Sequence, residues 1–132
     1  MAVFLTHDDA LALWREALYA GIKSNIADLS VRQMAILLTV YTASPPHTVR
    51  ALSKILNISK PAVSRAVETL KKRGLIKKRR DHYDRRSIHI QRTVKGTTFL
   101  LEFANYIRIA GRGLDGSIPF NPDELPLHQD PE

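Results

Sequence analysis

Polar and basic side chains of the kinds that bind nucleic acid gather between Thr48 and Arg65. The densest run is Ser59-Lys60-Pro61-Ala62-Val63-Ser64-Arg65, in which Ser59 is a typical helix cap and Pro61 fits a first helical turn. Hydroxyl groups and helix N-termini bind phosphate, and an arginine can pair with N7 and O6 of guanine. The spacing therefore predicts an exposed helix start with the chemistry of DNA recognition.

A second group of cations follows in the segment Arg80-Asp81-His82-Tyr83-Asp84-Arg85-Arg86. This segment has almost nothing to bury and lies between two runs of strand character, so it predicts the tip of a β-hairpin. Narrow minor grooves concentrate negative potential and favour inserted arginines, which Arg79, Arg80, Arg85 and Arg86 could supply. A solubilising tip is the alternative, although a charge-balanced tip would serve solubility equally well.

Two short helices joined by a tight turn are needed to position the first group. Thr48 is expected to cap a helix from Val49 to Leu56, Asn57-Ile58 forms the turn, and the next helix begins after Ser59. Gly74 stands where a left-handed C-terminal cap is expected. The pattern is that of a helix-turn-helix, whose second helix is expected to enter the major groove.

Two longer helices are predicted around this centre, and both have apolar stripes. The first begins at Thr6 and runs to about Ile22; the last begins at Thr93 and ends near Gly111. Their apolar positions exceed what a small winged domain needs for its own core, so we expect a homodimer interface. Its expected residues are Leu11, Trp14, Leu18, Ile22, Phe99, Phe103 and Ile107.

One more helix is predicted between Ser30 and Pro45-Pro46. Ser30 with Gln33 three residues later is a capping-box pattern. The apolar face expected for this helix comprises Val31, Met34, Ala35, Leu38 and Tyr41.

The charge is concentrated in the middle of the chain. Residues 47–95 contain 15 of the 20 Lys and Arg residues but only three acids, a local charge of +12 against +7 for all 132 residues. Such a basic segment is typical of modules that bind polyanions, although a solvated basic face is the alternative. The composition is otherwise that of one globular domain, without an apolar run long enough to cross a membrane or a secretory signal.

The stretch from Thr48 to Leu101 resembles the winged helix-turn-helix of the MarR (multiple antibiotic resistance regulator) family of bacterial transcription regulators. The matching residues are Leu52-Ser53, Leu56 to Arg65, Leu70 to Ile76, Asp84-Arg85-Arg86 and Thr93 to Gly96. The resemblance implies a homodimer that reads a near-palindromic operator. It implies DNA contacts from Ser59, Lys60, Ala62, Ser64 and Arg65, with Arg86 in the minor groove and Asp84 steadying it.

The C-terminal region departs from this family pattern. Members usually have a further long helix, whereas residues 111–132 of this chain hold three Gly, four Pro and five acids. We therefore expect a winged domain with flanking dimerisation helices over residues 1–110, a DNA-binding core at about 30–95, and an irregular tail at 111–132. A small-molecule effector between the dimer helices and the winged domain remains open.

Enzymatic and metal-binding functions are not expected. The five His residues form no H-x-x-x-H or H-E-x-x-H pair, and there is no Cys, so thiol chemistry, cysteine zinc sites and disulfides are excluded. The spacing Gly111-x-Gly113-x-x-Gly116 follows a helix rather than a strand, which is the wrong context for a dinucleotide site. We expect neither a metal nor another cofactor.

The sequence thus predicts a mainly α fold with a small β-hairpin wing. The predicted function is that of a cytoplasmic, nucleoid-associated bacterial transcription regulator, more specifically a repressor, which binds double-stranded DNA as a homodimer. The DNA-contacting set comprises Thr48, Ser59, Lys60, Pro61, Ala62, Ser64, Arg65, Arg79, Arg80, Arg85 and Arg86. Two alternatives are a winged-helix module that contacts protein and an architectural protein with little sequence preference.

Overall fold

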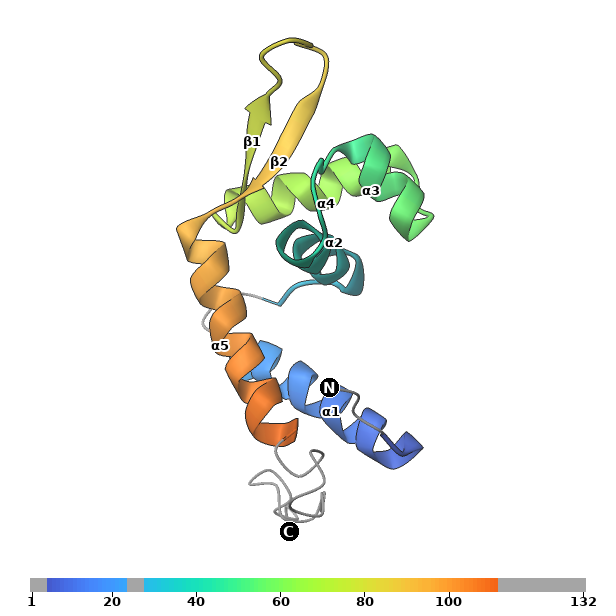
Figure 1. Cartoon of the computed structure of the whole chain (residues 1–132), viewed down its shortest axis with the longest axis vertical. Helices are drawn as coiled ribbons and strands as arrows, with labels where there is room; N and C mark the ends of the chain where they lie inside the picture. Colours follow the sequence, from blue (N-terminus) through green and yellow to red (C-terminus); the bar gives the residue numbers. More distant parts are fainter. Residues whose placement is uncertain (1–4, 24–27, 112–132) are drawn as a thin grey trace. The chain divides into compact units, whose positions relative to one another are not determined.

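The computed structural model describes residues 5–23 and 28–111, and the chain separates into two units (Figure 1). One unit is the winged part, Ile26–Leu100, and the other combines Met1–Asn25 with Leu101–Glu132. The predicted tail at 111–132 lies outside the described residues except for Gly111. The mainly helical fold with a hairpin wing is confirmed.

The winged unit contains three helices, a hairpin and the first residues of α5, and β2 leads directly into α5. The element order is α2 (Val31–Thr42), α3 (Val49–Leu56), α4 (Lys60–Lys72), β1 (Ile76–Arg80), β2 (Ile88–Arg92) and α5 (Val94–Ala110). The strands pair antiparallel with Ile76 opposite Arg92 and Arg80 opposite Ile88.

The core of the winged unit lies where α2, α3 and α4 meet the base of the hairpin. Ile90 N–H also donates to the His47 carbonyl at 2.8 Å, which joins the loop before α3 to β2. The fully buried large residues come from α2, α3, α4 and the start of β1: Ile36, Leu37, Val40, Leu52, Val63, Val67, Leu70, Leu75 and Ile76.

The apolar face predicted for α2 is wrong in part, since only its Met34, Ala35 and Tyr41 are half-buried. Ile36, Leu37 and Val40 are buried, whereas Val31 and Leu38 are exposed. Apolar side chains lie on most sides of this helix, so helical periodicity alone does not select one face. The packing of α2 against α3, α4 and β2 makes the choice.

The other unit contains α1 (His7–Lys23) and the second half of α5. Thr6 caps α1 as predicted, because its hydroxyl accepts a hydrogen bond from Asp9 N–H at 3.1 Å. The buried residues of this unit are small ones, Ala12, Ala20 and Ala110. Gly21 also lies near the Phe103 ring, so the packing in this unit uses mainly small side chains.

Candidate nucleic-acid interface

The turn between α3 and α4 is fixed by local hydrogen bonds. Thr48 Oγ1 accepts from Ala51 N–H at 3.1 Å and so caps α3. Asn57 ends α3 in the left-handed region, at φ 54°, a conformation that Asn tolerates better than most residues. Ser53 Oγ then donates to the Ile58 carbonyl at 2.6 Å. These contacts set the direction in which α4 begins.

Helix α4 buries one face and exposes another, as the sequence predicted. Ser59 Oγ accepts from Ala62 N–H at 3.2 Å, and Pro61 lies in the first turn, where no N–H partner is lost. Val63, Ala66, Val67 and Leu70 are buried. The exposed residues at the start of the helix are Ser59, Lys60, Pro61, Ser64 and Arg65, while Ala62 is half-buried.

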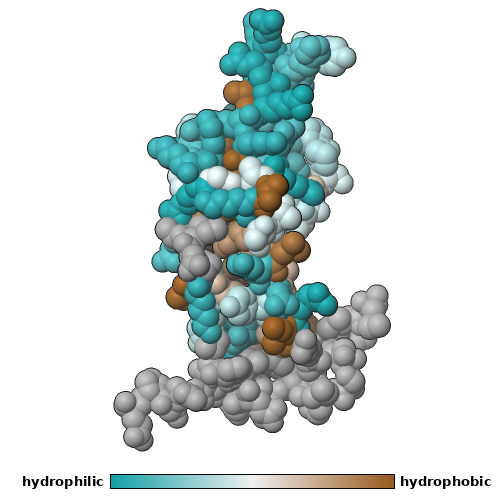
Figure 2. All heavy atoms as spheres, turned by 90° about the vertical axis from the view of Figure 1, so that its left-hand side faces the viewer, coloured by the Kyte–Doolittle hydropathy of each residue, from teal (hydrophilic) through white to brown (hydrophobic). Residues whose placement is uncertain are grey.

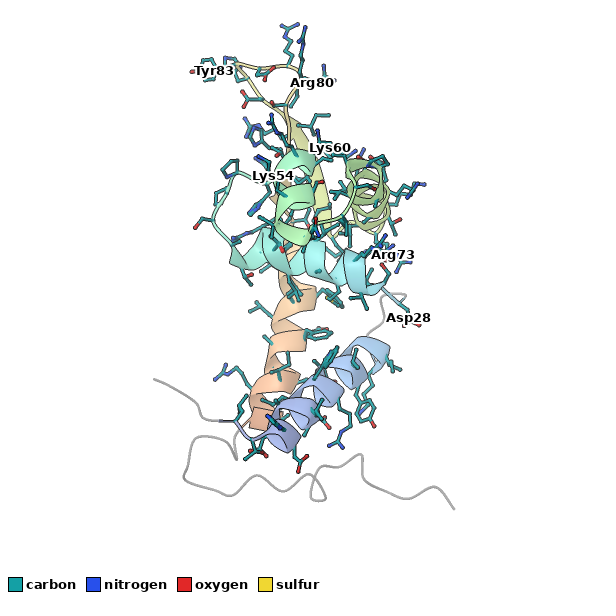
Figure 3. All side chains as sticks on the ribbon, turned by 90° about the vertical axis from the view of Figure 1, so that its right-hand side faces the viewer. Asp28, Lys54, Lys60, Arg73, Arg80 and Tyr83 are labelled. Carbon is teal, nitrogen blue, oxygen red and sulfur yellow. The ribbon has the colours of Figure 1, made fainter. Side chains whose placement is uncertain are left out.

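The hairpin extends basic side chains away from the core. Arg79, Arg80, Arg85 and Arg86 are exposed, and hydrophilic side chains cover most of the hairpin at the top of Figure 2. Arg80 and Tyr83 project outward at the end of the hairpin, and Lys60 and Lys54 lie on the helices below it (Figure 3). Helix α4 and the hairpin therefore offer two separate groups of cations in one unit.

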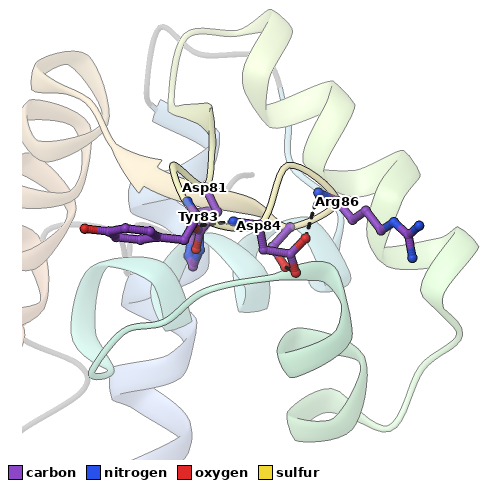
Figure 4. A network of polar contacts seen from close by, with 6 residues as sticks. Asp81, Tyr83, Asp84 and Arg86 are labelled. Carbon is purple, nitrogen blue, oxygen red and sulfur yellow. Dashed lines mark hydrogen bonds and ion pairs between the residues drawn. The ribbon is translucent and has the colours of Figure 1, made fainter.

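Two carboxylates organise the hairpin tip (Figure 4). Asp81 Oδ1 accepts from the backbone N–H groups of Tyr83 at 2.8 Å and Asp84 at 3.2 Å, and Asp81 Oδ2 lies 2.9 Å from His89 Nε2. The hydrogen bond with His89, and then those from the two amides, lower the pKa of Asp81 below its ordinary value. The carboxylate charge is thus stabilised in place.

Asp84 contacts the backbone of Arg86 and not its guanidinium. Its Oδ1 accepts from Arg86 N–H at 3.0 Å, and its Oδ2 accepts from Ser87 Oγ at 3.0 Å. The Arg86 side chain extends away from this carboxylate (Figure 4). Any orienting effect of Asp84 on Arg86 in the free protein therefore acts through the main chain.

An ion pair joins α4 to the hairpin. Lys78 Nζ of β1 donates to Glu68 Oε1 of α4. This hydrogen bond, together with the positive charges of Lys78, Lys71 and Lys72, lowers the pKa of Glu68. Because the pair is partly exposed, we assign it a positioning effect and little net stability.

The three acids of the basic segment leave most of its positive charge uncompensated. Glu68 pairs with Lys78, Asp81 pairs with His89, and Asp84 contacts Arg86 N–H and Ser87. Arg65, Arg79, Arg80, Arg85 and Arg86 are exposed, and none of these side chains has an acidic partner among the residues that the structure describes. A polyanion would meet these charges directly.

Sequence reasoning missed several residues of this surface. Arg50 and Lys54 are exposed four residues apart on α3, a spacing that places them on one face and could have been noticed. The contacts of Asp81 with His89 and of Glu68 with Lys78 join different elements. Their detection required the strand register and the packing of the hairpin beside α4.

The expected dimer residues fall into two groups. Leu11, Trp14, Leu18 and Ile22 of α1 are between 56% and 70% exposed in the single chain. On α5, Phe103 and Ile107 are half-buried, whereas Phe99 is only 6% exposed and lies in the winged unit. The stripe on α1 therefore has much more apolar surface to offer a partner than Phe99 has.

Within the described residues, no helix is long and apolar enough to cross a membrane. In the same part of the chain, His, Asp and Glu side chains do not gather in threes as metal ligands would.

Comparison with known families and structures gives a consistent result. A family model described as the MarR family matches residues 27–87. The transcriptional regulator Tm0710 from Thermotoga maritima is similar, with 22% identity and a TM-score of 0.67 over 77% of this chain and 69% of that one. A comparison with curated protein sequences finds no match.

Two further structures have the same fold. A mutant of S. aureus MepR bound to an oligodeoxyribonucleotide has 20% identity and a TM-score of 0.66, covering 87% of this chain and 86% of that one. A MarR transcriptional regulator from Methanosarcina mazei Go1 has 24% identity and a TM-score of 0.60, covering 84% and 79%. At these identities the likeness shows the fold.

Proposed function

We propose that the domain at residues 27–87, which a MarR family model matches, belongs to the MarR family of winged-helix transcription regulators and that the protein regulates transcription by binding an operator. Regulators of this family are not enzymes, in agreement with the sequence prediction. The observation that carries the proposal is the row of exposed arginines on α4 and the hairpin that have no acidic partner in the described residues.

Helix α4 is proposed to read the major groove. The start of α4 presents the side chains of Ser59, Lys60 and Ser64, and these suit phosphate contacts. Arg65 is exposed one turn into the helix and can reach base edges, where a bidentate pair with guanine gives specificity. Thr48, Pro61 and Ala62 lie beside this surface, and we propose that they pack against the sugar-phosphate backbone of the DNA.

The hairpin is proposed to enter the adjacent minor groove. Arg86 is the residue for the groove itself, with its backbone N–H held by Asp84, while Arg79, Arg80 and Arg85 contact phosphates. An arginine in a narrow groove senses its width, so the hairpin would read flanking sequence through DNA shape. The combination of the two grooves makes the regulator sequence-specific.

A homodimer is proposed to present two such domains. The α1 stripe leaves an exposed apolar surface of the kind that marks interfaces, and two-fold pairing would bury it. Two-fold symmetry would also match a near-palindromic operator with half-sites about one DNA turn apart, roughly 34–36 Å. A dimer that occupies a promoter acts as a repressor on the chromosome, in the cytoplasm of a bacterial cell.

A duplex selected by the protein from random DNA provides the test. The selected duplex and a scrambled duplex are titrated at about 50 and 200 mM salt. If the dimer neutralises about 6–10 phosphates, affinity should fall by about 10³–10⁵ between these salt concentrations. Equal affinity for both duplexes would favour the architectural alternative, and a flat salt dependence would favour the protein-interaction module.

A further inference from the structure

We propose that Asp81 and His89 are positioning residues that hold the wing tip in the conformation that contacts DNA, an inference that rests on the proposed DNA-binding function. One carboxylate joins three parts of the hairpin. Oδ1 holds the amides of Tyr83 and Asp84 in the tip, and Oδ2 holds His89 on β2. Because a carboxylate only accepts, His89 Nε2 carries the hydrogen of this bond.

The tip has little else that could define its conformation. Tyr83 is 96% exposed, and its ring makes a T-shaped contact with the His82 ring, with 5.1 Å between the ring centroids. Residues 82–86 are all exposed, so no apolar core lies beneath the turn. Beyond the contacts of Asp81, the tip is held by those of Asp84 and by the Asp81 N–H to Ser87 carbonyl bond at 2.9 Å.

This arrangement controls where the tip side chains point. The Tyr83 ring and the Arg86 side chain leave the turn on opposite sides (Figure 4). Asp81 fixes the main chain at Tyr83 and Asp84, and Asp84 in turn fixes the N–H of Arg86. Release of Asp81 would therefore free both ends of the turn, and DNA binding would then have to order it.

Positional and purely electrostatic roles of Asp81 predict opposite results. Asp81 stands among Arg79, Arg80, Arg85 and Arg86, so removal of its negative charge should tighten DNA binding if charge alone matters. If Asp81 positions the tip, its removal should weaken specific binding despite the gain in positive charge. The sign of the change separates the two roles.

The test uses the full chain and the duplex selected by the wild-type protein. Asp81→Ala should bind the duplex about tenfold more weakly, because binding would then have to order roughly one more loop residue. Asp81→Asn keeps an oxygen for the two amides and should lose less. His89→Ala should lose affinity too, and His89→Gln, which restores an N–H donor, should recover it. Asp8→Asn removes the same charge as Asp81→Asn from α1 and is the matched control.

Order in the tip is measured directly in the free protein. The ¹H–¹⁵N heteronuclear NOE of amides 82–86 should fall in Asp81→Ala while amides of α4 keep their values. Equal or tighter binding by Asp81→Ala, or unchanged order in the tip, overturns the positioning role. Arg65→Ala separates failure of the positioning role from failure of the proposed DNA-binding function. If Arg65→Ala also binds the duplex as the wild type does, the proposed DNA-binding function is wrong too; if Arg65→Ala binds more weakly, only the positioning role is wrong.

Discussion

Arg85 and Arg86 are neighbours on the exposed wing tip, and the proposed binding mode gives them different roles. Arg86→Ala should weaken binding most on duplexes whose half-sites are flanked by narrow A·T tracts, because a minor-groove arginine senses groove width. Arg85→Ala should weaken binding to all sequences about equally, as loss of a phosphate contact does. Titration of both variants against duplexes with A·T and G·C flanks measures the difference.

Stability controls accompany this comparison. Both side chains are exposed, so neither replacement should change the free energy of unfolding by more than about 0.5 kcal/mol. If Arg86→Ala lost the same affinity on both kinds of flank, Arg86 would be a phosphate contact and the minor-groove assignment would be wrong.

Asp81 gives the wing tip an acid-sensitive contact. Its pKa is lowered in the folded protein, so its stabilising contribution is complete above its ordinary pKa of 3.8 and is lost as the pH falls through the lower folded value. His89→Ala removes the largest cause and should raise the pKa of Asp81 toward 3.8. The pKa of Asp81 is measured in the wild type and in His89→Ala from the NMR chemical shift of its carboxyl carbon as the pH is varied. Identical titration curves would contradict the contact with His89.

Residue identity and local spacing were sufficient to predict the caps and the exposed cations. The capping box is present as expected, with Ser30 N–H donating to Gln33 Oε1 at 2.9 Å and Gln33 N–H to Ser30 Oγ at 3.1 Å. Gly74 has the expected positive φ, 75°. The partners of Asp81 and Glu68 could not be predicted, because those contacts join residues through the hairpin register and the packing of β1 beside α4.

At the scale of elements, the bounds of the helices followed from their caps and from breakers such as Pro45-Pro46. The buried face of α2 did not, because that helix carries apolar side chains on most sides and tertiary packing selects among them. Helix α4 was easier, since its polar residues leave only one apolar face, formed by Val63, Val67 and Leu70.

The junction between β2 and α5 is held tightly against Tyr41 of α2 and the backbone just before β1. Tyr41 Oη donates to the Leu75 carbonyl at 2.7 Å and accepts from Thr93 N–H at 2.9 Å. A Cβ at Gly96 would overlap both Tyr41 Oη and the Leu75 carbonyl. Gly96→Ala should therefore lower the free energy of unfolding by about 1–3 kcal/mol, although alanine has the higher helix propensity.

Urea unfolding measures this effect, and Gly21→Ala is the matched control. A Cβ at Gly21 would lie 3.4 Å from the Phe103 ring, an ordinary contact distance, so that variant should unfold at an equal or slightly higher urea concentration. Equal stability of Gly96→Ala and the wild type would show that the Tyr41 contact is dispensable.

At the scale of the whole molecule, the apolar stripe on α1 predicts self-association. The wild-type protein should sediment as a dimer at about tens of micromolar, because burial of Leu11, Trp14, Leu18 and Ile22 removes an exposed patch of a size that usually marks an interface. Leu18→Lys should sediment as a monomer. Val31→Lys changes an apolar residue on α2 that is more exposed than Leu18, 83% against 56%, and this variant should remain a dimer.

If the wild-type protein sedimented as a monomer at those concentrations, the proposed dimer would be wrong. The proposal of a near-palindromic operator would then also lose its basis. DNA binding by a single winged domain would remain testable, because the basic surface lies within Ile26–Leu100.

The central claim is that α4 and the hairpin together form the DNA-binding surface. The most direct measurement maps backbone amide chemical shifts of the full chain on addition of the selected duplex. The largest changes are predicted at residues 59–65 and 79–86, with smaller changes at Arg50 and Lys54 on α3. Changes confined to α1 and α5, with residues 59–65 and 79–86 unaffected at saturation, would contradict the claim.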